Sequence, residues 1–215
     1  MLHNQITNIF KFSLPLFFMR EFLLLALKAW TSPTFSLERL PDAGRMDLVC
    51  RTISNALWVS NDLRRDTIIH VALSGPKLPP KLISFSGALL KGVEPDERSL
   101  ASSIKLALKA GISLQLHEER DVFPGITIAK EAFETFIQKK SNTHQLIYLR
   151  HKGKDIRICL FQENVLFVFG DFLGLPKKTE KLLSRFGAEK ISLGPKTIFA
   201  SHCPIIIHNE LDRCR

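Results

Sequence analysis

The chain has 215 residues, of which 45% are hydrophobic and 24% charged, and this is ordinary for a folded soluble protein rather than a disordered one. At this length one well-buried core is expected, with room for an appendage. Thirty Lys and Arg against twenty-one Asp and Glu leave a charge of +9. That excess favours an anionic partner, nucleic acid first and a membrane surface second, although a basic surface kept for solubility is the plainer alternative.

The cysteines and aromatic residues narrow the class further. Cys50, Cys159, Cys203 and Cys214 form no C-x-x-C pair and no paired spacing, which argues against a disulfide framework and a structural zinc site. We therefore expect reduced thiols, a cytoplasmic location and no metal. Sixteen Phe against two Trp and one Tyr predict aromatic side chains used for packing rather than for base stacking.

Residues 1–18 are apolar and rich in Phe, with Lys11 as their only charged side chain. A signal peptide would need a cleaner apolar run and a small-residue cleavage site. A membrane span would need about 20 apolar residues, whereas Arg20 and Glu21 interrupt this stretch. We interpret residues 1–18 as an extension, such as an upstream start codon would add, and residues 19–215 as one domain that does not enter a membrane.

The first half of the domain alternates strands with helices. Apolar residues in the first helix recur at three- and four-residue steps, and acidic residues open the second, which Gly111 ends. The predicted elements are strands at residues 22–29, 67–73 and 82–85, the last of them at a sheet edge, and helices at residues 46–60 and 94–111.

The second half continues the alternation. A polar excursion at residues 117–121 separates two predicted strands within residues 112–130. The later elements are helices at 132–137 and 179–186, strands at 146–149, 165–170 and 190–192, and a final helix with Ser201 as its N-cap and Pro204 in its first turn. Strands alternating with helices predict an α/β fold with a mostly parallel sheet flanked by helices.

No glycine fingerprint for nucleotide binding, Gly-x-Gly-x-x-Gly or P-loop, occurs in the chain, which disfavours a Rossmann-type enzyme. The candidate ligand loops follow Leu149 and Gly170 and occupy residues 192–197, where strand ends offer free main-chain groups. Gly170 and Gly194 would let the main chain approach a ligand closely. Each loop alone is an ordinary turn, but the three in this order favour a ligand crevice in an open α/β sheet.

Two apparent constellations near the carboxyl end are not interpreted as sites. His208 and Asp212 lie four residues apart, after Cys203, in the manner of a Cys-His-Asp triad. On so apolar a helix the pair is more simply a surface or dimer-face contact. The adjacent residues His202 and Cys203 do not match the spacing of zinc ligands.

Seven motifs occur in order along the chain, at residues 44–47, 63–66, 95–98, 169–171, 191–195, 200–203 and 207–212. From Met19 to about Arg213 they resemble those of the archaeal-type tRNA pseudouridine(54) N1-methyltransferases, which belong to the SPOUT superfamily. The resemblance implies a deep trefoil knot at about residues 146–212, a homodimer, and S-adenosylmethionine bound in a bent shape within the knot. By position, the implied cofactor contacts are Leu149, Gly170, Ser192, Leu193, Gly194, Pro195, Lys196, Thr197 and Cys203.

The implied reaction is methylation of N1 of pseudouridine at position 54 in the T-loop of tRNA, giving 1-methylpseudouridine. N1 carries a proton, so a base must take it or donors must stabilise the resulting anion, and the base must leave its stack. We predict Asp66 as the base or positioning acceptor, with Asp47 as the other candidate carboxylate. The predicted RNA contacts are Arg45, Arg64, Arg65 and Arg98.

Three alternatives stay open at this point. Residues 63–66 are also compatible with a solvated charged turn. The target of a SPOUT enzyme could be ribosomal RNA, at pseudouridine N1 or at a ribose 2′-hydroxyl, although residues 170–176 offer no Arg for ribose chemistry. The third alternative is a non-catalytic basic RNA-binding or membrane-peripheral protein anchored by residues 1–18.

Overall fold

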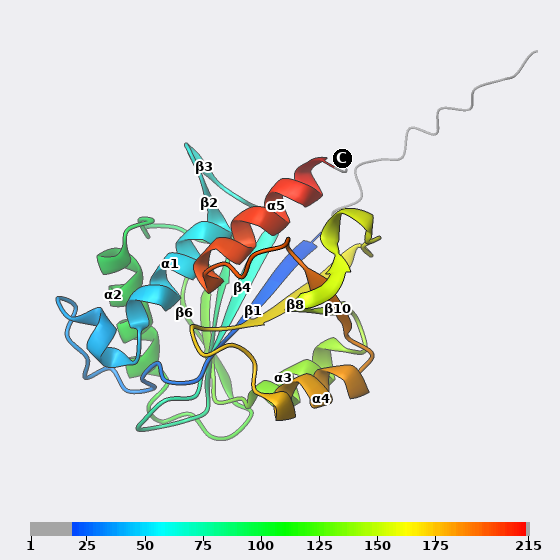
Figure 1. Cartoon of the computed structure of the whole chain (residues 1–215). Helices are drawn as coiled ribbons and strands as arrows, with labels where there is room; N and C mark the ends of the chain where they lie inside the picture. Colours follow the sequence, from blue (N-terminus) through cyan, green and yellow to red (C-terminus); the bar gives the residue numbers. More distant parts are fainter. Residues whose placement is uncertain (1–18, 214–215) are drawn as a thin grey trace, which may run out of the picture.

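The computed structural model describes residues 19–213, so the predictions for residues 1–18 and for Cys214 lie outside the described part (Figure 1). Its main feature is an eight-stranded sheet in the order β10-β8-β9-β1-β4-β5-β7-β6. The strands are β1 (Met19–Ala26), β4 (Thr67–Leu73), β5 (Lys81–Ser86), β6 (Glu119–Phe123), β7 (Ile126–Ala129), β8 (Gln145–Asp155), β9 (Asn164–Gly170) and β10 (Glu189–Ser192). Neighbours from β10 to β4 pair in parallel, and β5, β7 and β6 continue the sheet antiparallel.

Helices cover both faces of this sheet. In Figure 1, α1 (Met46–Leu57), α2 (Glu97–Ala110) and α5 (Cys203–Arg213) lie on one face, and α3 (Phe133–Lys140) and α4 (Lys177–Arg185) lie on the other. The smaller elements are the hairpin β2 (Trp58–Val59) and β3 (Asp62–Leu63), and the 3-10 turns η1 (Leu40–Ala43), η2 (Ile156–Ile158) and η3 (Ala200–His202). The predicted α/β fold with a mostly parallel sheet is confirmed.

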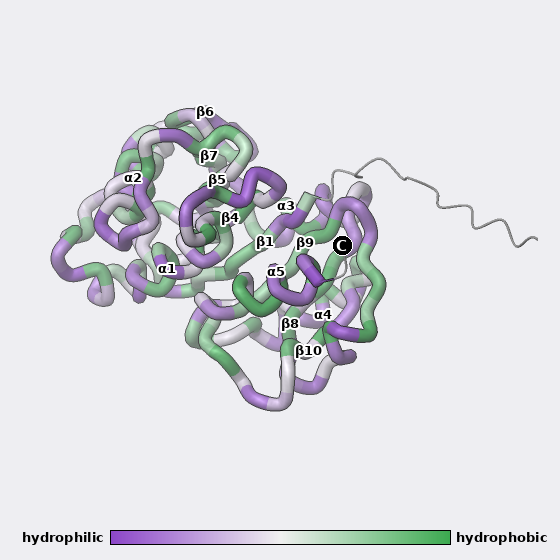
Figure 2. The backbone as a smooth tube through the Cα atoms, turned by 90° about the horizontal axis from the view of Figure 1, so that it is seen from above, coloured by the Kyte–Doolittle hydropathy of each residue, from purple (hydrophilic) through white to green (hydrophobic). Residues whose placement is uncertain are grey.

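The central strands are apolar on both faces because both faces are covered. In β1, Phe22 and Leu24 pack in the cluster that includes α1, α2 and α5, whereas Leu23 and Leu25 pack in the cluster that includes α3 and α4. Such doubly buried parallel strands have continuous rather than alternating apolar sequences. Figure 2 shows the hydrophobic colour concentrated along these inner strands.

Local signals placed several elements correctly. The strand predicted at residues 67–73 is β4. Helix α2 begins after Asp96, whose side chain accepts a hydrogen bond from the Ser99 amide at 2.9 Å. Gly187 follows α4 with a φ of 75°, the left-handed conformation that glycine adopts at helix ends.

Other elements differ from the prediction. Strand β5 lies inside the sheet between β4 and β7, not at its edge. The polar excursion predicted at residues 117–121 overlaps the edge strand β6, and residues 112–116 form no strand. An edge strand tolerates charged residues because one side of it faces water. Helix α1 ends at Leu57, where Trp58 enters the hairpin. Ser201 lies within η3 rather than at an N-cap, and α5 starts at Cys203.

A buried carboxylate connects β1 to the segment after α3. Glu21 is 5% exposed and accepts hydrogen bonds from His70 and His144, each at 3.0 Å, and from Lys140. Burial alone would raise the pKa of Glu21, but the hydrogen bonds of His144 and His70 and the charge of Lys140 hold its pKa well below the ordinary 4.5. The ionised form therefore stabilises the fold above pH 4.5, and this contribution is lost as the pH falls toward the lower, folded-state pKa.

Glu21→Gln is expected to lower the free energy of unfolding at pH 7 by about 3 kcal/mol, since it leaves the buried partners of the carboxylate uncompensated. It should also reduce the loss of stability that the wild type shows between about pH 5 and 3. Urea unfolding at a series of pH values measures both effects. Glu134→Gln, at an exposed position of α3, is the matched control. An acid dependence that is the same in Glu21→Gln and wild type would contradict this account.

Candidate active site

A cavity of about 780 Å³ opens at the carboxyl ends of β9 and β10 and beside residues 149–151 of β8, just beyond the part of β8 that pairs with β9. Parallel strands have their carboxyl ends on the same side of the sheet, so loops far apart in sequence meet there. Of the nine predicted cofactor contacts, all except Pro195 line this cavity: Leu149, Gly170, Ser192, Leu193, Gly194, Lys196, Thr197 and Cys203. The structure therefore brings the three predicted loops together, and their contact with a cofactor stays a prediction.

Gly170 is required by its own loop rather than by a ligand. A Cβ at this position would lie 2.2 Å from the carbonyl carbon of Gly174. The loop is fixed by Asp171, whose carboxylate accepts hydrogen bonds from the amides of Leu27 and Leu173, each at 2.9 Å. Asp171 is 7% exposed, and burial raises its pKa. The loop that forms one wall of the cavity is thus held to the end of β1.

The second wall is the turn after β10. Ser192 Oγ donates to the Gly194 carbonyl at 3.0 Å, and the Gly194 amide approaches the same hydroxyl at 3.3 Å. Gly194 has a φ of 143°, in the region that favours glycine, and the space beside its Cα is open. The turn therefore presents main chain to the cavity, as free main-chain groups at a ligand site require.

Cys203 contributes an apolar surface and not a nucleophile. It is 7% exposed, and burial raises the pKa of its thiol to about 12, so the thiol stays protonated near neutral pH. Its Sγ contacts the Phe199 carbonyl at 3.6 Å.

His208 is buried in the core, and its interpretation as a surface or dimer-face contact is wrong. It is 2% exposed; its Nε2 donates to the Ala56 carbonyl at 2.9 Å, and Nδ1 accepts from the fully buried Arg20 at 2.9 Å. Burial lowers the pKa of His208 to about 3. Asp212 pairs with Arg20 at 2.7 Å and with Arg64 at 2.8 Å. These contacts fasten α5 to the start of β1.

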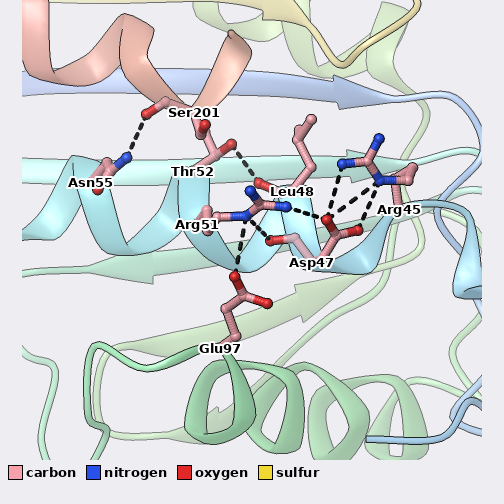
Figure 3. A network of polar contacts seen from close by, with 8 residues as sticks. All are labelled: Arg45, Asp47, Leu48, Arg51, Thr52, Asn55, Glu97 and Ser201. Carbon is pink, nitrogen blue, oxygen red and sulfur yellow. Dashed lines mark hydrogen bonds and ion pairs between the residues drawn. The ribbon is translucent and has the colours of Figure 1, made fainter. Parts of the chain in front are cut away.

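Asp47 lies between two arginines (Figure 3). Arg45 donates to both of its carboxylate oxygens at 3.0 Å, and Arg51 binds the same carboxylate while pairing with Glu97 at 3.2 Å. Burial alone would raise the pKa of Asp47, but the two guanidinium groups lower it. The carboxylate is therefore ionised and holds Arg45 in place.

Arg45 and Asp47 stand beside the cavity. The Arg45 guanidinium lies over the ring of Phe172, 5.6 Å from its centroid, and Phe172 lines the cavity. Leu48, one residue after Asp47, lines it too. Arg45 occupies the N-cap position of α1 with a φ of 68°, which is uncommon for a residue other than glycine.

Asp66, by contrast, lies at the amino ends of the parallel strands, opposite the cavity at their carboxyl ends. It precedes Thr67, which pairs with Arg20 at the start of β1, and Arg20 pairs with Val165 at the start of β9. Gly170 follows five residues later along β9, about 17 Å away at the rise of a strand. Asp66 is 3.6 Å from Arg20. Within a single chain Asp66 therefore lies far from the cavity, whereas Asp47, the other candidate carboxylate, lies beside it, and the catalytic role of each stays a prediction.

The other predicted RNA contacts are divided in the same way. Arg64 and Arg65 lie next to Asp66 at the amino ends of the parallel strands, where Arg65 donates a hydrogen bond to the Gly87 carbonyl at 3.1 Å. Arg98 lies on α2, pairs with Glu38 at 3.2 Å, and lines a second cavity of about 500 Å³. Of the four arginines predicted to contact RNA, only Arg45 lies next to the first cavity.

The cavity also includes residues that the sequence did not single out. They are charged or aromatic side chains at its lining: Arg150, His151, Phe172 and Phe199. Phe172 directly follows the motif at residues 169–171, and Phe199 directly precedes the motif at residues 200–203. Their position next to a motif is the sequence signal that could have pointed to these two residues. Within residues 19–213, no cluster of three or more His, Cys, Asp or Glu is placed to hold a metal. In the same range no helix is long and apolar enough to cross a membrane.

Comparison with known proteins places the chain in a family. Residues 19–215 match the family model described as "Putative SAM-dependent RNA methyltransferase". The tRNA (pseudouridine(54)-N(1))-methyltransferase of Methanococcus aeolicus is 43% identical over 205 residues, covering 92% of this chain and 99% of that protein. The protein of the same name from Methanocaldococcus jannaschii is 39% identical over 202 residues, covering 92% and 98%.

A solved structure shares the fold at much lower identity. The structure of Archaeoglobus fulgidus Nep1 bound to S-adenosylhomocysteine matches with a TM-score of 0.59 and 12% identity, covering 91% of this chain and 97% of that one. At this identity the likeness concerns the fold alone. From the matches along nearly its whole length, the chain belongs to the tRNA (pseudouridine(54)-N(1))-methyltransferase family of SAM-dependent RNA methyltransferases.

Proposed function

We propose that this protein transfers a methyl group from S-adenosylmethionine to N1 of pseudouridine 54 in the T-loop of tRNA, giving 1-methylpseudouridine. The observation that carries the proposal is the cavity formed by β8 and the carboxyl ends of β9 and β10 in a chain 43% identical to an enzyme of that name. The charge of +9 suits an RNA substrate.

The cavity residues fit an adenosyl cofactor. A volume of about 780 Å³ is in the range of small-molecule sites. The turn at residues 192–197, the end of β9 at Gly170 and the main chain of β8 at Leu149 offer donors and acceptors for a base edge, while Cys203 supplies an apolar wall. Pro195 stiffens the turn from outside the lining. When bound, the cofactor supplies a sulfonium methyl whose S–C bond breaks as the N1–C bond forms.

The chain's own residues must manage the N1 proton and the charge that its loss leaves. We propose Asp47 as the carboxylate that acts next to the target base, because it adjoins the cavity and holds Arg45 there. Arg45 can then face the developing charge on the ring oxygens. Asp66 stays the alternative carboxylate. Arg64, Arg65 and Arg98 are proposed to contact RNA phosphates at a distance from the target base.

The proposal includes one domain at residues 19–215 with a trefoil knot at about residues 146–212. Its support is the close approach of two paired strands within this region: a Cβ on Gly153 of β8 would lie 2.3 Å from the carbonyl carbon of Ile191 of β10. The β10 pairing also jumps from Tyr148, beside Lys190, to Lys154, beside Ile191. Residues 149–153 of β8 thus have no partner in β10, and the parallel pairing resumes at Lys154 after this irregularity.

A homodimer in the cytoplasm completes the proposal. Ile158 and Leu160 are 68% and 90% exposed, and Ile205 on α5 is 48% exposed. Helix α5 contacts η2, so these apolar side chains gather on one side of the domain. A second copy would cover them. Cysteines 50, 159 and 203 are free thiols, which suits a reducing compartment.

Methylation of two matched tRNA transcripts tests the reaction. One carries pseudouridine at position 54 and the other uridine, with radiolabelled S-adenosylmethionine as donor. We expect label only in the pseudouridine transcript, recovered as 1-methylpseudouridine by mass spectrometry of the nucleosides. Equal labelling of both would refute N1 chemistry. Labelling of ribosomal RNA instead would assign the alternative substrate, and a labelled ribose would assign 2′-O-methylation.

A further inference from the structure

Two phenylalanines at the cofactor cavity expose their rings to water. Phe172 is 48% exposed and Phe199 is 71% exposed, and both line the cavity. Within residues 19–213 the third exposed phenylalanine is Phe123, on the edge strand β6, which lines the second cavity instead. The sequence predicted that aromatic side chains serve packing, and these two do not.

The two rings stand on backbone that is already fixed. The Asp171 carboxylate binds the amide that follows Phe172, and Arg45 lies over the Phe172 ring. The Phe199 carbonyl accepts from the His202 amide at 2.9 Å, and its ring meets the His202 ring edge-on, with centroids 5.5 Å apart. An apolar ring held in place and left in water is a preformed contact surface, because ordering it on binding costs little.

We propose that Phe172 and Phe199 are stacking surfaces that receive the target base after it leaves the RNA stack. This inference rests on the proposed function and adds residues to it. A flipped base loses stacking on both faces, and exposed aromatic rings replace that interaction in RNA-binding proteins. The rings adjoin the cavity where the methyl would be delivered, so a base held there lies next to it. Arg45, beside Phe172, adds positive charge next to the ring oxygens of the base.

Leucine substitutions separate stacking from packing. Leucine keeps an apolar side chain and removes the aromatic face, so Phe172→Leu and Phe199→Leu should each raise KM for the pseudouridine transcript about tenfold. The affinity for S-adenosylmethionine, measured by isothermal titration, should not change. Phe172→Tyr and Phe199→Tyr should restore KM, because tyrosine keeps the ring. Leu116→Ala, at an exposed apolar position that lines neither of the two cavities, should leave KM unchanged.

Two other outcomes of these measurements would overturn the inference. A weakened cofactor affinity in the leucine variants would assign the rings to the cofactor pocket. An unchanged KM together with a shift from dimer to monomer, measured by light scattering, would assign them to contact with a second copy. RNA affinity measured by fluorescence anisotropy distinguishes this failure from failure of the proposed function. If the wild type methylates neither transcript, weaker RNA binding by the leucine variants would still support the aromatic contact, and unchanged binding would refute it.

Discussion

Gly170→Ala is expected to weaken S-adenosylmethionine binding roughly thirtyfold, measured by isothermal titration. The added Cβ would lie 2.2 Å from the Gly174 carbonyl carbon and 2.7 Å from the Leu175 amide nitrogen, and both atoms are main chain. The loop at residues 171–175 must therefore shift. Overpacking of this kind costs about 1–3 kcal/mol. A penalty of about 2 kcal/mol on the loop conformation that binds the cofactor corresponds to that loss of affinity.

Gly187→Ala is the matched control for this substitution. Gly187 has a φ of 75°, so alanine strains the backbone there, but nothing lies within 4 Å of its added Cβ and it does not line the cavity. The control should lose about 1 kcal/mol of stability and keep its cofactor affinity. If Gly170→Ala binds S-adenosylmethionine as the wild type does while remaining folded, the loop is not a wall of the cofactor site.

Asp47→Asn is expected to lower kcat by roughly 10²-fold, the lower end of what loss of a proton-transfer group costs, with unchanged cofactor affinity. The neutral amide cannot hold two guanidinium groups as the carboxylate does, so Arg45 is released from its position over Phe172. The variant thereby loses both the candidate acceptor and the placement of a cation beside the target base. Single-turnover methylation at saturating tRNA measures this step without product release.

Asp66→Asn is the comparison that decides between the two candidate carboxylates. Asp66 lies at the amino ends of the parallel strands, away from the cavity at their carboxyl ends, so its substitution should leave kcat nearly unchanged. The reverse result, a large loss in Asp66→Asn and none in Asp47→Asn, would show that the site is completed by Asp66 from a second protomer. Thermal unfolding of both variants controls for damage to the fold, since both carboxylates are ion-paired.

Gly170 and Asp47 lie on two different walls of the same site. The loop held by Asp171 shapes the cavity for the cofactor, whereas the arginines around Asp47 present charge to the RNA. They meet at Phe172, which belongs to the loop and lies under Arg45. Loss of the loop should therefore reduce cofactor binding first, and loss of Asp47 should reduce turnover alone.

Local sequence determined the elements and the position of the ligand loops. The continuous apolar runs of β1, β4 and β9 predicted buried strands, because a strand covered on both faces has no polar side. Parallel strands put their carboxyl ends on one side of the sheet, so the sequence alone predicts that the loops after Leu149, Gly170 and Ser192 lie close together. The motifs around these loops also carried the family resemblance, which the relatives confirm.

Tertiary structure alone decided which polar residues meet. Arg20 reaches His208 across 188 positions of the chain, and Asn55 binds the Ser201 carbonyl across 146. Periodicity shows which face of an element is apolar, but not which distant element packs against it. For this reason His208 was expected at a surface, and the sequence could not show that Asp66 and Asp47 lie far apart. The charged residues of the motifs at 44–47 and 63–66 carry no local signal that shows at which end of the strands they lie. Only the register of the strands shows that the two motifs lie at opposite ends.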